Sequence, residues 1–130
     1  MLLYVDTNVY LDYLLERGNR AGDDLSNVAF QLFKRAADCE FRIVLSDAVL
    51  LELRSHIEPH KTTSFFTFLE RKLDHVRTTA ADRDAARRIN THQADALHIV
   101  LARKAGADIL VTRNITDFSG HIETELPEHI

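Results

Sequence analysis

The sequence predicts an α/β fold with a largely parallel sheet of about five short strands, covered by helices on both faces. Three observations lead to this prediction. Short apolar runs alternate with longer segments that have the apolar spacing of amphipathic helices. The 130 residues suit one domain, which would bury roughly two-thirds of its unfolded surface. Finally, an acidic residue follows the first strand and another follows a late strand, at the sheet edge where α/β proteins usually hold ligands.

Five segments are predicted as strands. The first, Leu2 to Val5, ends on the polar triplet Asp6-Thr7-Asn8, and the apolar run Ile109 to Val111 ends on Thr112-Arg113-Asn114. Residues 41–45 are rich in β-formers, whereas residues 75–77 and a final segment near 121–123 are weaker. Because strands and helices alternate, the connections are expected to be right-handed crossovers, which give a largely parallel sheet.

Six segments are predicted as helices, most of them from the spacing of their apolar residues, although residues 82–89 are polar. They are residues 9–16, residues 25–37, the segment after Ser46 or Asp47 that holds Glu52, residues 62–73, residues 82–89, and the segment from Asp95 to a glycine stop at Gly106. Gly18 and Gly22 predict a loop after the first helix, and the acidic stretch of residues 18–27 could alter access to a substrate. Pro59 is predicted to end the third helix.

The fourth predicted helix carries Phe65, Phe66 and Phe68. Such aromatic residues could stack on nucleic-acid bases. However, they follow helical spacing and do not alternate with basic residues, so packing in the core or in a dimer interface is the preferred interpretation.

Composition narrows the class of protein. A hydrophobic content of 45% and a charged content of 28% are typical of a globular domain, and no apolar run reaches the roughly 20 residues of a membrane helix. The single Cys39 cannot form an internal disulfide, which fits a cytoplasmic protein. The net charge of −4 argues against nucleic-acid binding through bulk charge. Two basic groups, which are either a local binding patch or solvated helix faces, contain Arg83, Arg87 and Arg88, and Arg103, Lys104 and Arg113.

Four motifs occur in order along nearly the whole chain. They are Asp6-Thr7-Asn8-Val9 after the opening strand, Glu52 within an apolar helix, Asp95-Ala96-Leu97-His98, and Thr112-Arg113-Asn114 followed by Asp117-Phe118. Together they resemble the PIN-domain ribonucleases, and the size of the chain is most similar to the stand-alone VapC toxins of toxin–antitoxin pairs. The resemblance implies a three-layer α/β/α sandwich formed by a single domain over residues 1–130.

The resemblance also implies a metal-dependent endoribonuclease. Hard cations such as Mg²⁺ or Mn²⁺ prefer carboxylate ligands and can activate a water for phosphodiester hydrolysis. Asp6, Glu52, Asp95 and Asp117 are therefore the expected metal ligands and catalytic residues, with Asp6 and Asp95 as the first choices. Thr7, Asn8, Thr112 and Asn114 are expected to support these carboxylates or the substrate, and Arg113 is a candidate phosphate contact. The family further implies a homodimer, an RNA substrate such as a tRNA or rRNA loop, and a cognate antitoxin whose tail enters the acidic groove.

Each site residue also has a purely structural interpretation. Asp6 and Asp95 stand near helix N-termini, where an acidic side chain caps the backbone or meets the helix dipole. Glu52 could form a salt bridge, and Asp117 could close a turn after Asn114. His98, one helical turn after Asp95, could be a general base, but a packed or carboxylate-bonded histidine is preferred. A histidine metal site at His56 and His60 is disfavoured, because Pro59 interrupts their helical spacing.

Two other classes of function share some of these sequence features. A PIN fold could serve only as an RNA- or protein-binding module, although such a module is expected to lose an acidic residue and this chain keeps all four. A phosphatase or phosphoacceptor domain would also place an acid after its first strand. The haloacid-dehalogenase pattern needs a second aspartate where this chain has Asn8, and the receiver pattern needs a late lysine where it has Thr112 and Arg113. Neither of these patterns fits.

Overall fold

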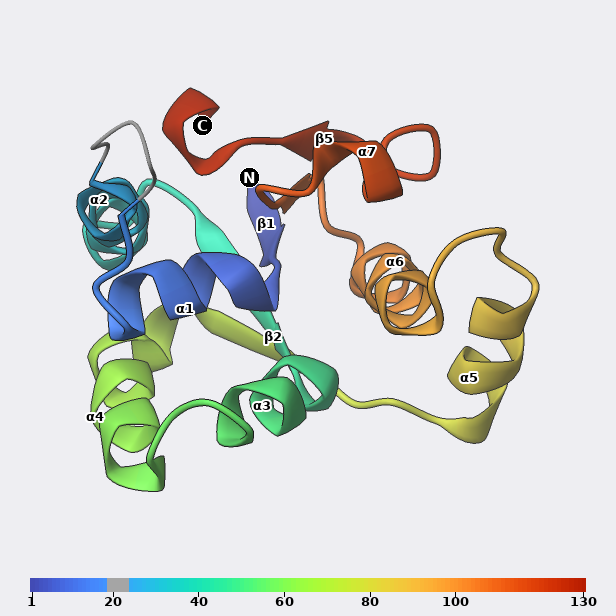
Figure 1. The fold of residues 1–130 in the computed structure, drawn as a ribbon, viewed down its shortest axis with the longest axis horizontal. Coiled ribbons are helices and arrows are strands. Elements are labelled where there is room, and N and C mark those ends of the chain that lie inside the picture. The colour runs from blue at the N-terminus through green and yellow to red at the C-terminus, as the bar shows by residue number, and fades with distance from the viewer. Residues whose placement is uncertain (19–23) are drawn as a thin grey trace.

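The computed structural model describes residues 1–18 and 24–130, and Figure 1 shows its arrangement. In this part of the chain one five-stranded sheet forms, with every neighbouring pair parallel and the strand order β3-β2-β1-β4-β5. The strands are β1 (Leu2–Val5), β2 (Arg42–Ser46), β3 (Leu73–Val76), β4 (Ile109–Val111) and β5 (Thr124–Glu125). The predicted parallel α/β sheet is therefore confirmed. The loop predicted between Gly18 and Gly22 falls on residues 19–23, which lie outside the described residues.

The helices cover the sheet from both sides. Figure 1 shows α1, α2 and α4 on one side and α5 and α6 on the other, which makes the sandwich three layers thick. The helices are α1 (Thr7–Leu14), α2 (Leu25–Ala37), α3 (Asp47–Arg54), α4 (Pro59–Leu69), α5 (Ala80–Arg87), α6 (Gln93–Ala105) and α7 (Ile115–Phe118), with short 3₁₀ turns η1 (Glu70–Lys72) and η2 (Pro127–His129). None of the helices in the described ranges is long and apolar enough to cross a bilayer.

The strand order creates a switch point beside β1. From β1 the chain moves to β2 and β3 on one side, then crosses back to β4 and β5 on the other. The residues that follow β1 and β4 therefore emerge together, and the Asp6 backbone N–H donates to the Val111 carbonyl at 2.9 Å. Open α/β sheets bind ligands in the crevice beyond the strands' carboxyl ends at such a point. The topology thus brings together the acidic and polar residues at the two strand ends.

The structure corrects several predicted boundaries. The prediction that Pro59 ends the third helix is wrong, because α3 ends at Arg54 and Pro59 is the first residue of α4. Proline has no N–H to leave unpaired at a helix start, so it favours that position. The third strand begins at Leu73, inside the helix predicted for residues 62–73, and the fifth begins at Thr124, just after the segment predicted. Residues 115–118, for which no element was predicted, form the short helix α7.

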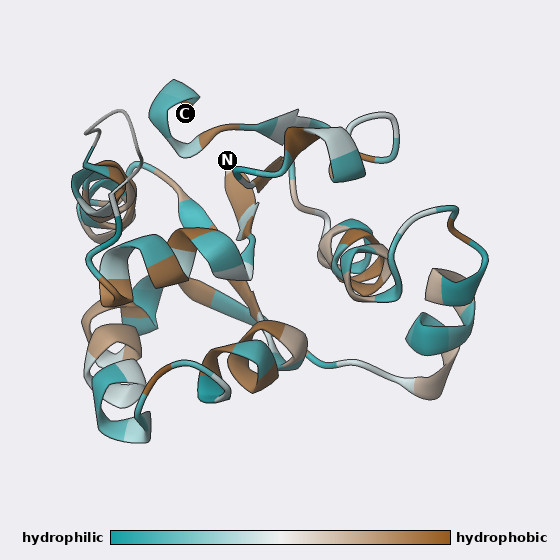
Figure 2. Ribbon diagram, viewed as in Figure 1, coloured by the Kyte–Doolittle hydropathy of each residue, from teal (hydrophilic) through white to brown (hydrophobic). Residues whose placement is uncertain are grey.

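Hydrophobic residues concentrate on the strands and on the helix segments beside them (Figure 2). On the α1 side the core is aromatic. Tyr10 stacks on Phe33 with ring centroids 5.1 Å apart, and Phe33 meets the edge of Phe65 at 4.9 Å. Core packing is thus confirmed for Phe65, whereas Phe68 of the same helix is exposed.

Helix α5 is largely hydrophilic (Figure 2), so polar contacts attach it to the fold. Thr79 and Asp82 form a capping box at its start, and Lys104 of α6 donates to the Asp82 carboxylate at 2.8 Å. The hydrogen bond from Lys104 lowers the pKa of Asp82 below its ordinary value of 3.8. The ion pair therefore stabilises the protein above about pH 3.8, and this stabilisation is lost as the pH falls further.

We expect Asp82→Asn to lower the free energy of unfolding by about 1 kcal/mol at pH 7, because the amide keeps the cap but loses the ion pair. The difference from the wild type should shrink as the pH falls below about 3.8. Urea titrations of both proteins at several pH values measure it. A stability difference that does not change with pH would show that the ionised carboxylate contributes nothing.

Candidate active site

Asp6 occupies the turn between β1 and α1. It is the N-cap of α1, and its Oδ1 accepts from the Thr7 backbone N–H at 2.7 Å. Its Oδ2 accepts from the Thr112 hydroxyl at 2.8 Å, so β4 helps to hold it. The residue is only 7% exposed. Burial raises the pKa of Asp6, and the His98 charge and the Thr112 hydrogen bond offset this only in part. The capping interpretation of Asp6 is thus correct, but the cap also holds a buried carboxylate at the switch point.

Glu52 reaches the same point from α3. Its Oε1 lies 2.9 Å from Nε2 of His98, which comes from α6. Burial alone would raise the pKa of Glu52, but the hydrogen bond and the charge of His98 outweigh it and the pKa is lowered. His98 is 2% exposed, and its Nε2 lies 4.0 Å from Oδ1 of Asp6. The prediction of a carboxylate-bonded histidine at this position is confirmed.

Asp95 stands in the first turn of α6 but does not cap that helix, because His92 holds the N-cap position. Burial raises the pKa of Asp95, and the negative charges of Asp6 and Asp117 raise it further. Asp117 lies in α7 and is held by Asn114, whose amide donates to its carboxylate. Asp117 therefore lies in a helix and not in the turn considered from the sequence, and its negative charge acts on Asp95. The acids gathered here therefore repel one another, since the negative charges of Asp6 and Asp117 disfavour the ionised form of Asp95.

A cavity of about 440 Å³ opens over these side chains. Its lining contains Asp6, Thr7, Asn8, Leu11, Glu52, Ser55, His56, Ala94, Asp95 and Asn114. Asp117 and Thr112 are absent from that lining. The Thr112 hydroxyl nevertheless supports it, because it donates to Asp6 and accepts from the Asn8 amide at 3.3 Å. The structure therefore brings together most of the predicted site residues. It adds His56, which sequence reasoning set aside although it follows Glu52 by one helical turn.

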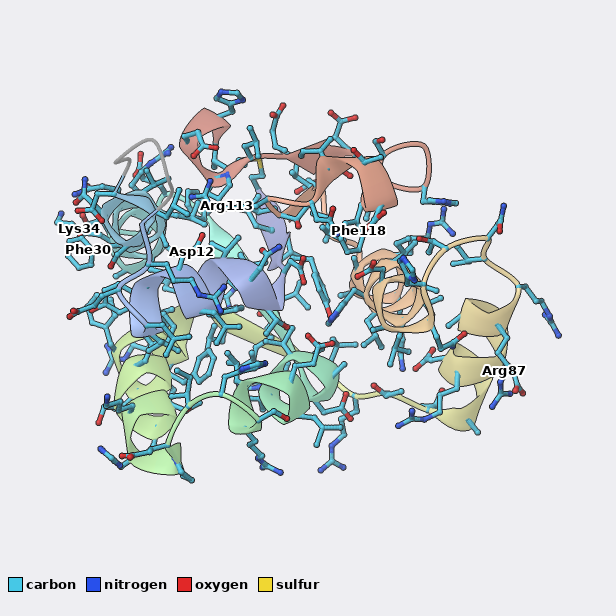
Figure 3. The ribbon with its side chains drawn as sticks, in the orientation of Figure 1. Asp12, Phe30, Lys34, Arg87, Arg113 and Phe118 are labelled. Atoms are coloured by element: carbon cyan, nitrogen blue, oxygen red, sulfur yellow. The ribbon has the colours of Figure 1, made fainter. Side chains whose placement is uncertain are left out.

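Arg113 forms ion pairs that the sequence analysis did not predict. Its guanidinium donates to the carboxylates of Asp12 in α1 and Glu128 in η2, and it does not line the cavity. Figure 3 labels Arg113 and Asp12 in the region between α1 and the C-terminal segment. Arg113 therefore connects the end of β4 to α1 and to η2.

The donor set fits a divalent cation. One carboxylate oxygen from each of Asp6 and Glu52 and one ring nitrogen of His98 lie within 4.8 Å of one another. Two buried atoms at the cavity, the Thr7 hydroxyl and the Asn8 Oδ1, have no hydrogen-bond partner among the described residues. Hard cations such as Mg²⁺ are bound by one or two carboxylates and keep several waters, which such unpaired polar atoms can bind. These features suit a hydrated cation beside the carboxylates of Asp6 and Glu52, and Asp95 lines the same cavity.

We expect Mn²⁺ to raise the melting temperature of the wild type, because a ligand that binds only the folded state stabilises it. Asp95→Asn should reduce that rise and should raise the melting temperature without metal. The pKa of Asp95 is raised, so its ionised form destabilises the fold at neutral pH, and this cost disappears below about pH 3.8. Differential scanning fluorimetry with Asp84→Asn as control tests this, since Asp84 is an exposed acid of α5. Equal metal shifts in wild type and Asp95→Asn would remove Asp95 from the site.

The family model described as "PIN domain" matches residues 3–116. Comparison with curated protein sequences gives no match. The chain is similar to a protein of the Rickettsia felis VapBC2 complex bound to a promoter DNA fragment, with 17% identity, a TM-score of 0.66 and coverage of 97% of this chain and 98% of the other.

Two further solved structures have the same fold. FitAcB from Neisseria gonorrhoeae aligns over 100% of both chains with 18% identity and a TM-score of 0.61. VapC20 from Mycobacterium tuberculosis, described as a toxin that cleaves the sarcin-ricin loop, aligns over 83% of this chain and 86% of the other, with 20% identity and a TM-score of 0.57. At these identities the similarity shows the fold alone.

Proposed function

Because the chain belongs to the PIN domain family, we propose that it is a metal-dependent endoribonuclease and the toxin of a toxin–antitoxin pair. The observation that carries the proposal is the convergence of Asp6, Glu52 and Asp95, from three separate elements, on one cavity at the switch point of the sheet. A fold that needed these acids only as caps or surface charges would not gather them where they repel one another. Their arrangement instead suits a cation and a phosphodiester.

Asp6 and Asp95 would hold Mg²⁺ or Mn²⁺, with Glu52 beside them. The bound cation would supply an activated water and would compensate the negative charge that builds on the phosphate oxygens. Within this chain, Thr112 fixes Oδ2 of Asp6 through its hydroxyl, and Asn114 fixes Asp117 at the outer edge of the site. Glu52 is placed to accept a proton from, or to orient, the attacking water. The unpaired Thr7 hydroxyl and Asn8 Oδ1 are available to a water or to the substrate.

A second cavity gives RNA a path to the acids. It has a volume of about 510 Å³, and it shares Glu52 and Ala94 with the acidic cavity. Its lining includes Arg54 of α3 and Arg83 of α5, which can meet backbone phosphates that a protein of net charge −4 would otherwise repel. Arg83 lines this cavity, which also contains the acid Asp47, whereas Arg87 pairs with the exposed Asp84 on the same helix.

The proposed partners follow from the same comparison. VapBC2 and FitAB are pairs, and two of their structures also contain DNA. We propose that this chain likewise binds a cognate antitoxin that covers the acidic cavity, and that it forms a homodimer in the cytoplasm. Co-expression of the chain with the product of a neighbouring small gene, followed by size-exclusion chromatography with light scattering, tests both partners.

Incubation of the purified protein with total RNA tests the reaction itself. We expect cleavage with Mn²⁺ or Mg²⁺ and none with EDTA or with Asp95→Asn, and end sequencing of the products would identify the cut sites. The Asp84→Asn control should cleave as the wild type does. Metal binding without cleavage of any RNA would contradict the proposal and favour a PIN-fold binding module.

A further inference from the structure

A buried chain of hydrogen bonds runs behind the acidic cavity. Ser46 Oγ lies 2.8 Å from Tyr4 Oη, Tyr4 Oη lies 2.6 Å from His98 Nδ1, and His98 Nε2 lies 2.9 Å from Glu52 Oε1. Tyr4 and Ser46 are fully buried and His98 nearly so. This series of hydrogen bonds links β1, the end of β2, α6 and α3, so it connects the sheet and two helices to one carboxylate.

We propose that His98, held by Tyr4 and Ser46, is a positioning residue that fixes the Glu52 carboxylate at the metal site. This inference rests on the proposed function. Among the described residues, His98 is the hydrogen-bond partner of the Glu52 side chain within 3.5 Å. Glutamate has three side-chain torsions, and a half-buried one on an apolar helix would otherwise turn toward water. Loss of the contact should therefore misplace the carboxylate without unfolding the protein.

The hydrogen-bond donors around His98 indicate that the ring nitrogen facing Glu52 carries a proton. Ser46 Oγ already accepts from the Val49 backbone N–H at 3.1 Å, so its own hydrogen can point to Tyr4 Oη. The Tyr4 hydroxyl is then free to donate to His98 Nδ1, which places the ring proton on Nε2. A doubly protonated ring also carries a proton on Nε2. In both charge states of the ring, His98 therefore donates to the ionised Glu52 carboxylate.

The protein offers a matched pair of variants. Tyr4→Phe removes one buried hydroxyl from this series of hydrogen bonds, while Tyr10→Phe removes a fully buried hydroxyl that has no partner among the described residues. Both changes keep the ring and nearly the same volume. At His98, glutamine can present an amide N–H near the position of Nε2, whereas leucine removes the donor. Partners that orient metal ligands typically change metal affinity by about 10–100-fold.

Titration calorimetry with Mn²⁺ alone measures the effect. We expect Tyr4→Phe and His98→Leu to weaken Mn²⁺ binding by about tenfold or more, Tyr10→Phe to change it by less than about twofold, and His98→Gln to recover most of the affinity. Wild-type affinity in both Tyr4→Phe and His98→Leu would overturn the proposal. If His98→Leu does not fold, Tyr4→Phe against Tyr10→Phe and the recovery by His98→Gln still decide it.

Two spectroscopic measurements separate this inference from the nuclease proposal. In metal-free protein, NMR should show a His98 Nε2–H proton in slow exchange that shifts in Glu52→Gln, and its absence would overturn the inference whatever the protein does to RNA. In Mn²⁺-loaded protein, pulsed electron paramagnetic resonance should show no coupling to a directly bound ¹⁴N. Such a coupling would make His98 a ligand and overturn the positioning role. A protein that passes these tests but does not cleave RNA would contradict the nuclease proposal alone.

Discussion

Replacing Asp6 with asparagine is expected to reduce RNA cleavage by at least about a thousandfold, which corresponds to a loss of about 4 kcal/mol of transition-state stabilisation. Asp6 is the most buried of the four acids, and it lies at the switch point where the cation would bind. Its charge acts at short range with little screening by water, so its removal should cost more than removal of the outer Asp117. Single-turnover cleavage of a mapped RNA site with saturating Mn²⁺ measures the loss.

The same substitution should leave the fold intact. Asparagine is a preferred N-cap, so it can replace Asp6 as acceptor for the Thr7 backbone N–H. The pKa of Asp6 is raised by burial, so the ionised carboxylate is unfavourable in the folded protein above about pH 3.8. The metal-free variant should therefore melt at the same temperature as the wild type or higher at neutral pH. Cleavage by Asp6→Asn within tenfold of wild type would exclude Asp6 from the reaction, and Asp84→Asn again controls for net charge.

The sequence predicts these acids because their positions follow from local rules. A polar residue that ends a buried parallel strand must emerge at the carboxyl edge of the sheet, so Asp6 after β1 and Thr112 after β4 could be assigned before the structure was known. The one-turn spacing of Asp95 and His98 likewise places both on one stretch of α6. The pairing of His98 with Glu52 could not be assigned, because 46 residues separate them and their contact depends on how α3 and α6 dock.

Local ambiguity explains the other differences. Pro59 is compatible with the end of one helix and with the start of the next, and only the packing of α4 decides between them. The hydrogen bonds that join Ser46, Tyr4 and His98 could not be predicted from the sequence for a different reason. Tyr4 has the apolar character of a buried strand, and its hydroxyl acquires a role only when β2 and α6 bring Ser46 and His98 within reach.

Arg113 shows how a residue beside an active site can serve the fold. It follows β4 directly, as a phosphate-binding arginine could, but its Nε donates to Asp12, which is 2% exposed, and its Nη1 lies 3.1 Å from Glu128. These contacts tie the end of β4 to α1 and to the C-terminal turn η2. Since 101 residues separate Arg113 from Asp12, the pairing is not visible in the sequence.

We expect Arg113→Met to lower the free energy of unfolding by about 3 kcal/mol, because it removes the hydrogen-bonded partner of the buried Asp12 charge and leaves Arg17, 4.0 Å away, to compensate it. The double variant Asp12→Leu with Arg113→Met should recover most of this loss, since a buried ion pair can often be replaced by apolar residues at little cost. Urea unfolding of the two variants measures both effects. Cleavage by the folded fraction should keep a wild-type KM for RNA. A stable Arg113→Met protein with a raised KM for RNA would instead support Arg113 as a phosphate contact. It would also show that the ion pairs of Arg113 break when RNA binds.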